Sequence, residues 1–267
     1  MKLANKKILL TGGSGGLGTE IASQLHRSGA KLILVGRNSK ALEKLAILLN
    51  RGDETTVEFF VADISSKVER EKLINFCRTN HRDLDGIINN AGINEFALLS
   101  DSDGEQYFDI METNLSAPIH LIHQLLPLLK NREQAVIANI GSTLGSIGFP
   151  GYSVYCASKF GMRGFTEALR RELSDTRIQV LYFAPRAINT SMNSQKVDAM
   201  NNELGSKSDC PTTVAKQLID ALINDKKKQF FVGWPEKFFA KLNSIMPGIV
   251  DGAMKKQLTI VKKYSAQ

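Results

Sequence analysis

The stretch Lys7-Ile8-Leu9-Leu10-Thr11-Gly12-Gly13-Ser14-Gly15-Gly16-Leu17-Gly18 joins a short apolar run directly to a glycine-rich loop. The helical apolar pattern of Ile21, Ala22 and Leu25 follows at once, so the segment predicts a strand, a loop and a helix. In this setting glycines permit a tight turn and close backbone approach, while N–H groups at the helix N-terminus face a pyrophosphate. Glycine-rich turns are common, but this position between strand and helix favours a dinucleotide-binding loop.

Further apolar runs alternate with helical patterns along the rest of the chain. They occupy residues 31–35, 57–62, 84–88, 135–140, 178–183 and 230–233. Alternating strands and helices predict an α/β fold, a single-domain doubly wound parallel sheet (Rossmann fold) of about seven strands. No repeat or low-complexity linker interrupts the pattern, so we expect one domain over residues 1–233 and a C-terminal helical extension of it over residues 234–267.

The end of the second predicted strand carries a basic residue, in the segment Gly36-Arg37-Asn38-Ser39. An acidic residue here would accept hydrogen bonds from a ribose 2′-hydroxyl, whereas Arg37 suits a 2′-phosphate. Together with Asn38 or Ser39, and with Ser14, Arg37 therefore predicts NADP(H) rather than NAD(H). The alternative is a solvated surface arginine.

Polar residues also follow the third and fourth predicted strands. Asp63-Ile64 is placed to reach an adenine, although Asp63 is equally suited to be the N-cap of the next helix. Asn89-Asn90-Ala91-Gly92 offers small and amide side chains that suit close packing against a cofactor or, alternatively, a plain turn.

A candidate catalytic group lies in the stretch from Gly141 to Lys159. Tyr155 and Lys159 are one helical turn apart, so the ammonium is expected near the phenol, where it would lower the phenol pKa. Ser142 leaves the fifth predicted strand at its C-terminal end, where ligands bind in open parallel sheets. A Gly- and Pro-containing loop can bring its hydroxyl back beside the phenol, and the two hydroxyls would then hold one substrate oxygen. Taken alone, Tyr-x-x-x-Lys is more often an ordinary helix pair.

The long helical pattern from Asp109 to Lys130 contains Asn114, which has poor helix propensity and suggests a kink that holds a water molecule. His120 and His123 lie three residues apart in the same pattern, but no third ligand is evident, so no metal site is expected. Cys77, Cys156 and Cys210 are widely spaced and are interpreted as reduced structural thiols.

Charge is distributed unevenly over the 267 residues, whose formal net charge is +7. Nine lysines and two acidic residues lie from Lys226 onward, so the tail carries all of this charge and the body is neutral. This pattern argues against a nucleic-acid groove through the body and confines any attraction to anionic surfaces to the tail. With no long apolar run and no room for a signal before Lys7, a cytoplasmic location is the default expectation.

With the glycine loop, Asn89-Asn90-Ala91-Gly92, Asn114, Ser142, Tyr155 and Lys159 in order, the chain resembles the short-chain dehydrogenase/reductase family over roughly residues 5–195. The resemblance implies that Tyr155 donates or accepts a proton and that Lys159 binds the nicotinamide ribose. It implies that Ser142 positions the substrate oxygen and that Asn114 holds a water in a proton relay. The cofactor-binding residues would be Gly12, Ser14, Gly16, Leu17, Gly18, Arg37, Asp63, Ile64, Asn90, Ala91, Gly92, Tyr155, Lys159, Pro185 and Thr190.

The family segment Pro-Gly-x-x-x-Thr appears here as Pro185-Arg186-Ala187-Ile188-Asn189-Thr190. Thr190 matches the residue expected to contact the nicotinamide carboxamide. Arg186 replaces the usual glycine, which affects the expected backbone path at the pocket mouth. The polar segment within residues 186–210 is expected to be the substrate lid.

Apolar residues recur at helical spacing in the tail, at Phe238, Phe239, Leu242, Ile245 and Met246, with Lys237 and Lys241 off the stripe. This stripe is expected to pack on the body of the protein or on a partner subunit; the alternatives are peripheral contact with a membrane through residues 234–263 or a cover over an apolar substrate cavity.

The resemblance implies an NADP(H)-dependent oxidoreductase that interconverts a carbonyl and a secondary alcohol on a small or lipid-like substrate, as a dimer or tetramer. An alternative is an NADP-binding regulatory or scaffold protein without significant turnover, although such a protein need not keep the serine, tyrosine and lysine together. A sugar-nucleotide epimerase is a further Tyr-x-x-x-Lys alternative, and the basic strand tip and short C-terminal portion argue against it.

Overall fold

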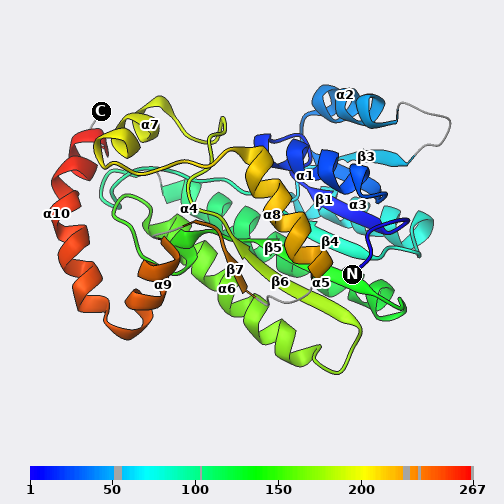
Figure 1. Ribbon diagram of the computed structural model, residues 1–267. Coiled ribbons are helices and arrows are strands. Elements are labelled where there is room, and N and C mark those ends of the chain that lie inside the picture. The colour runs from blue at the N-terminus through cyan, green and yellow to red at the C-terminus, as the bar shows by residue number, and fades with distance from the viewer. Residues whose placement is uncertain (51–55, 103, 225–228, 234–235, 266–267) are drawn as a thin grey trace.

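The structure is a computed structural model that describes residues 1–50, 56–102, 104–224, 229–233 and 236–265. One sheet of seven parallel strands, in the order β3-β2-β1-β4-β5-β6-β7, runs through the molecule (Figure 1). The strands are β1 (Lys7–Thr11), β2 (Lys31–Gly36), β3 (Val57–Val61), β4 (Gly86–Asn89), β5 (Ala135–Ile140), β6 (Ile178–Ala184) and β7 (Gln229–Phe231). The predicted doubly wound parallel sheet is therefore confirmed.

Helices cover both faces of the sheet (Figure 1). Those connecting or flanking the strands are α1 (Gly16–Arg27), α2 (Ser39–Leu49), α3 (Lys67–Asn80), α4 (Gly104–Met111), α5 (Ala117–Lys130), α6 (Ser153–Glu172) and α8 (Pro211–Asn224). Helix α7 (Gln195–Glu203) and the C-terminal α9 (Glu236–Ile245) and α10 (Pro247–Ser265) lie beyond one edge of this layered body. Among the described helices, none combines the length and apolarity needed to span a bilayer.

The strands are continuous apolar runs because both of their faces are buried. Alternate residues of a strand point to opposite faces, and β1 divides accordingly: Ile8 and Leu10 join the core beneath α1, α2 and α8. Leu9 joins the other core, which α3, α5 and α6 cover. Each helix contributes one apolar stripe to its core, so local sequence periodicity and tertiary burial agree.

The strand order reverses direction between β1 and β4, which pair with each other although they are not consecutive in the chain. Loops that leave neighbouring strands at such a switch point diverge and open a crevice at the carboxyl ends of the strands. The glycine loop after β1 and the Asn90-Ala91-Gly92 turn after β4 meet there, so the topology itself places the predicted cofactor residues together.

The helix expected over Asp109–Lys130 is interrupted. Helix α4 ends at Met111, a π-helical segment follows over Glu112–Ser116, and α5 begins at Ala117. Single π turns within helices are rare and frequent at functional sites. Asn114 lies in this π-helical turn, at the position where the sequence suggested a kink.

A buried polar chain crosses the sheet behind the site. Asn89 Nδ2 donates to Asn139 Oδ1 at 2.8 Å, and Asn139 Nδ2 donates to Thr166 Oγ1 at 2.9 Å. Thr166 Oγ1 in turn donates to the Met162 carbonyl at 2.6 Å. Because Asn139 and Thr166 are wholly buried, these bonds fix the position of α6 against β5 without help from water.

Replacing Asn139 with Ala is expected to lower the free energy of unfolding by about 2 kcal/mol, because it leaves the Asn89 amide N–H without its buried partner and leaves the Thr166 hydroxyl with Met162 alone. Urea denaturation measures the effect, and Asn202→Ala on the exposed side of α7 is the matched control. Equal stability of the two variants would show that the buried chain does not hold the helix.

Candidate active site

The glycine loop is shaped by direct backbone contact. Gly12 has a φ of 65°, in the region that favours glycine. A Cβ on Gly18 would lie 1.9 Å from the Gly12 carbonyl oxygen, so the first turn of α1 closes on the loop only with glycine there. Asn90 secures this contact, because its Nδ2 donates to the carbonyls of Thr11 at 3.1 Å and Gly12 at 3.2 Å.

The turn after β4 is held by β1 in return. Thr11 Oγ1 accepts from the backbone N–H groups of Asn90 at 3.0 Å and Ala91 at 3.1 Å. The predicted cofactor turn is therefore a brace for the glycine loop as well as part of the crevice wall. Sequence reasoning gave Thr11 no role in the site, although its position at the end of β1 was a signal for one.

A cavity of about 690 Å³ extends from this loop. Thr190 faces the N-terminus of α1 closely, because a Cβ on Gly16 would lie 2.9 Å from Thr190 Cγ2. Predicted cofactor residues share its wall, namely Gly12, Gly16, Leu17, Gly18, Asn90, Ala91, Gly92, Tyr155, Lys159, Pro185 and Thr190. A glycine cradle that side chains would fill, joined to the N-terminus of α1, fits the pyrophosphate of a nicotinamide dinucleotide.

The remaining predicted cofactor residues lie at the tips of β2 and β3. Arg37 is largely exposed, and its Nη1 lies 3.7 Å from Asp63 Oδ2. The Ser14 hydroxyl adjoins Gly36, 3.2 Å from where a Cβ would lie. Burial disfavours the Asp63 carboxylate, but hydrogen bonds from Ser65 and the charge of Arg37 outweigh burial, so the pKa of Asp63 is lowered.

The alternative role of Asp63 as a helix cap is wrong. Ser66 is the N-cap of α3, and its hydroxyl accepts from the Glu69 N–H at 3.4 Å. Asp63 instead accepts from the Ser65 N–H at 2.9 Å and the Ser65 hydroxyl at 2.7 Å, which shapes the turn that carries Ile64.

The candidate catalytic side chains converge on the cavity wall. The Ser142 hydroxyl lies near the Tyr155 phenol, where it favours the ionised form of the phenol. The Lys159 ammonium lies 5.7 Å from the centre of the Tyr155 ring and donates to the Ile140 carbonyl at 3.0 Å. The loop from β5 has therefore folded back beside the helix, as the sequence predicted.

The pKa of Tyr155 does not follow the expectation that Lys159 lowers it. Burial raises the pKa of Tyr155 to about 12, although the nearby Ser142 hydroxyl opposes the rise. Burial also lowers the pKa of Lys159 to about 8. Spacing along a helix predicts that the two groups are neighbours but not how deeply they are buried, and here burial outweighs attraction.

Asn114 belongs to the same cluster through backbone contacts. Its Nδ2 donates to the Ile93 carbonyl at 2.8 Å and to Ser158 Oγ at 3.1 Å, while its Oδ1 accepts from the Ile93 N–H at 2.9 Å. The side chain thus joins the loop after β4 to α6. Ile93 and Ser158 were missed because their link to Asn114 is tertiary.

Tyr182 is a further residue that sequence reasoning passed over as part of a strand. Its wholly buried ring lies under the catalytic loop, where a Cβ on Gly141 would be 2.2 Å and one on Gly145 2.2 Å from its atoms. Its hydroxyl donates to the carbonyl of Ser142 at 3.3 Å or of Lys159 at 3.4 Å. Only glycine at positions 141 and 145 therefore leaves room for this ring.

The histidines of α5 have other partners. Arg70 Nε donates to His120 Nδ1 at 3.0 Å, and His120 Nε2 lies 3.5 Å from Glu71. His123 Nδ1 contacts the neighbouring Gln124 amide at 3.3 Å. The contacts of the two side chains are thus structural.

The lid is clamped at its base by the residue that departs from the family pattern. Arg186 forms a two-pronged ion pair with Asp209, with distances of 2.9 Å and 2.6 Å. The backbones of Ala187 and Asn189 pair with Asp209 as well, at 2.8 Å and 3.0 Å. Arg186 was expected to affect the backbone path at the pocket mouth, and its pair with Asp209 closes the loop between residues 186 and 209 there.

The C-terminal helices complete the cavity. Phe239 of α9 and Val250, Ala253, Met254 and Gln257 of α10 line it. Helix α7 of the lid adds Val197, Met200 and Asn201. Two of the interpretations of the apolar stripe apply to its inner side: it packs on the protein's own body, and it covers the cavity.

The comparisons with known proteins agree with this geometry. Residues 6–201 match the family model for the short chain dehydrogenases. The chain is 34% identical over 222 residues to the 3-oxoacyl-(acyl-carrier-protein) reductase FabG of Haemophilus influenzae, covering 80% of this chain and 90% of that one. A short chain dehydrogenase of Burkholderia cenocepacia solved with NADP has a TM-score of 0.79 at 20% identity, covering 95% of this chain and 99% of that one.

A second solved neighbour, from Burkholderia phymatum, is a short chain dehydrogenase/reductase in complex with NAD. Its TM-score is 0.80 at 20% identity, with 91% of this chain and 94% of that one covered. Fold and crevice thus define a nucleotide-binding oxidoreductase of the Rossmann type. The chain belongs to the short-chain dehydrogenase/reductase family.

Replacing Lys159 with Met is expected to stabilise the fold without nucleotide by about 1–3 kcal/mol at pH 7, because the buried ammonium is costly. The folded pKa of about 8 lies below the ordinary 10.5. The cost is therefore fully present below the folded pKa and disappears as the pH rises through the ordinary one.

Urea denaturation at pH 7 and at pH 10.5 measures this difference, with Lys72→Met on the exposed face of α3 as the control. A destabilised Lys159→Met variant at both pH values would show that the bond to Ile140 outweighs the burial cost.

Proposed function

We propose that the protein is an NADP(H)-dependent oxidoreductase that interconverts a carbonyl and a secondary alcohol on a small or lipid-like substrate. The observation that carries the proposal is that Ser142, Tyr155 and buried Lys159 share the wall of one cavity, which the glycine cradle also lines. The Haemophilus relative, named as a reductase of a 3-oxoacyl group, supports carbonyl chemistry.

The cofactor would lie along the crevice at the carboxyl ends of β1 and β4. Gly12, Gly16 and Gly18 would hold its pyrophosphate at the N-terminus of α1, with Thr190 closing the crevice. Arg37 and Ser14 would hold a 2′-phosphate, and Asp63 and Ile64 would border the adenine. Bound nicotinamide supplies the redox chemistry, by exchanging a hydride with the substrate carbon.

The protein groups would handle the oxygen and the proton. Ser142 Oγ and the Tyr155 phenol would hold the substrate oxygen, and the phenol, with its pKa of about 12, stays protonated as a donor for reduction. The Lys159 ammonium would stabilise the phenolate that proton donation leaves. Because the Asn114 side chain is engaged by Ile93 and Ser158, a relay water would be held by the backbone of the π turn.

We further propose that residues 1–233 carry cofactor binding and catalysis, and that residues 234–267 extend the same domain over the substrate, in a cytoplasmic protein. A homo-oligomer is also proposed. Phe108 of α4 and Phe160 of α6 support it, because these adjacent helices expose 74% and 42% of the two residues.

Replacing Tyr155 with Phe is expected to lower kcat by at least about a hundredfold while NADPH binding stays nearly intact, because only the proton donor is lost. A screen of carbonyl compounds that follows NADPH absorbance gives the rate, and fluorescence titration gives the affinity. Tyr152→Phe is the control, since its ring lines the same cavity. Substantial residual turnover would contradict the assignment. Tight binding without any wild-type turnover would favour a regulatory NADP-binding protein.

Replacing Arg37 with Ala is expected to weaken NADPH binding by about ten- to a hundredfold and to change NADH binding little, because only NADPH carries the 2′-phosphate. Dissociation constants for both nucleotides measure this preference, with Arg27→Ala on the exposed end of α1 as the control. Equal losses for NADPH and NADH would mean that Arg37 does not select the cofactor.

A further inference from the structure

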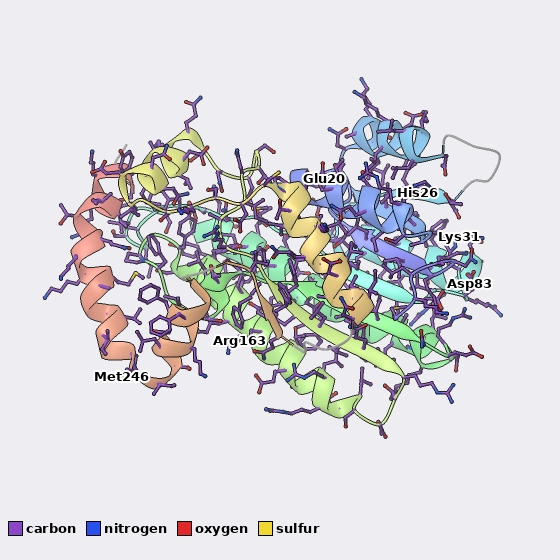
Figure 2. All side chains as sticks on the ribbon, in the orientation of Figure 1. Glu20, His26, Lys31, Asp83, Arg163 and Met246 are labelled. Atoms are coloured by element: carbon purple, nitrogen blue, oxygen red, sulfur yellow. The ribbon has the colours of Figure 1, made fainter. Side chains whose placement is uncertain are left out.

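The turn between α9 and α10 presents a cluster of exposed apolar side chains, here called the apolar elbow: Phe238, Phe239, Ile245, Met246 and Ile249. Ile245 is 68% and Ile249 53% exposed. The turn is tight, since the Met246 N–H donates to the Leu242 carbonyl at 2.7 Å and the Ile249 N–H to the Met246 carbonyl at 3.2 Å. Figure 2 shows Met246 at the outer tip, far from the sheet. A cluster of this kind on a well-anchored turn marks an interaction surface.

The inner side of the same turn is fixed to the catalytic loop. Ala240 and Val250 are buried and pack with Ile147. Asn243 Nδ2 donates to the Ser146 carbonyl at 2.9 Å. The elbow is thus held in a defined orientation by residues that adjoin Ser142, and its exposure is not a consequence of a loose tail.

The charge around the elbow selects its partner. Lys241, which lies beside the apolar stripe of α9, is exposed, as are Lys255, Lys256 and Lys262 of α10. Asp251 is the acidic residue of these two helices between Phe238 and Ser265. A two-fold contact between copies of this chain would bring lysines against lysines, whereas an anionic lipid surface complements both the apolar tip and the charge.

The elbow is also continuous with the cavity. Phe239 belongs to the elbow and lines the cavity, and Val250 and Met254 continue the apolar wall inward along α10. Phe239 therefore joins the exposed elbow to the wall of the cavity.

We propose that the apolar elbow docks the protein on an anionic phospholipid surface and that a lipid-like substrate enters the cavity there. Docking stands on the elbow and its lysines alone, whereas substrate entry rests on the proposed oxidoreductase function. Apolar side chains at the tip would enter the headgroup region, and the lysine ammonium groups would lie at the phosphate level.

Co-sedimentation of the full chain with vesicles tests docking, using phosphatidylcholine alone or mixed with phosphatidylglycerol, at low and high salt. Wild-type protein is expected to bind the mixed vesicles and to be released by salt. The double variant Ile245→Asp/Ile249→Asp is expected to bind at least about tenfold more weakly, because two apolar anchors are lost. Ile47→Asp/Val68→Asp is the matched control, since both positions are 66% exposed on other helices.

A charge variant, Lys255→Glu/Lys256→Glu, is expected to lose the preference for phosphatidylglycerol while its circular dichroism stays that of the wild type. Ile245 and Ile249 do not line the cavity, so the aspartate variant should keep wild-type turnover of a water-soluble ketone and lose the advantage on a long-chain ketone embedded in vesicles.

Three results would overturn docking, and a fourth would overturn substrate entry alone. Wild-type protein that does not bind mixed vesicles at low salt, or an aspartate variant that binds as well as wild type, would exclude docking. A dimer in light scattering that the aspartate variant abolishes, without vesicle binding, would identify a contact between copies. Vesicle binding without turnover of any carbonyl compound would leave docking in place and reject the proposed function and substrate entry.

Discussion

The hydrogen bond from the Lys159 ammonium to the carbonyl of Ile140 holds the active-site region together. It ties α6 to the last residue of β5, so Tyr155, one helical turn earlier, is directed at the loop that carries Ser142. A buried charge is unfavourable, and the low pKa of Lys159 expresses this cost. Packing of the surrounding core must therefore offset the free-energy cost of burying the Lys159 ammonium, which the α/β fold by itself does not impose.

The supports around Lys159 show how this cost is tolerated. Tyr182 lies beneath both the catalytic loop and the Lys159 carbonyl, and the Asn139 chain holds α6 from behind. Tyr182 and Asn139 are wholly buried side chains of strands β6 and β5, and their polar atoms are hydrogen-bonded. Wholly buried polar groups with bonded atoms resist displacement. The candidate catalytic residues can therefore keep one arrangement on a wall that is partly open to solvent.

Sequence reasoning succeeded where a local pattern has one physical meaning. Apolar runs separated by helical stripes had to form a parallel sheet, and the contact of Gly18 with the Gly12 carbonyl admits no side chain. It failed where tertiary burial decides, because spacing along a helix predicted that the pKa of Tyr155 is lowered, whereas burial raises it. The partnership of Arg186 with Asp209 likewise joins residues that no short motif connects.

The segment expected to be the lid is held by different kinds of contact at its base and at its tip. At its base the two-pronged Arg186–Asp209 pair is mostly buried and is reinforced by backbone bonds. At its tip Glu203 of α7 meets Lys263 at 2.6 Å and Tyr264 at 2.8 Å on the exposed side of α10. Exposed ion pairs contribute little to stability, but Val197 and Met200 of α7 also pack with Val261 of α10 in a buried apolar cluster, which therefore holds the tip. Because α10 packs with α7, lines the cavity and continues into the apolar elbow, the proposed access to Tyr155 and the proposed attachment to a surface would depend on one helix.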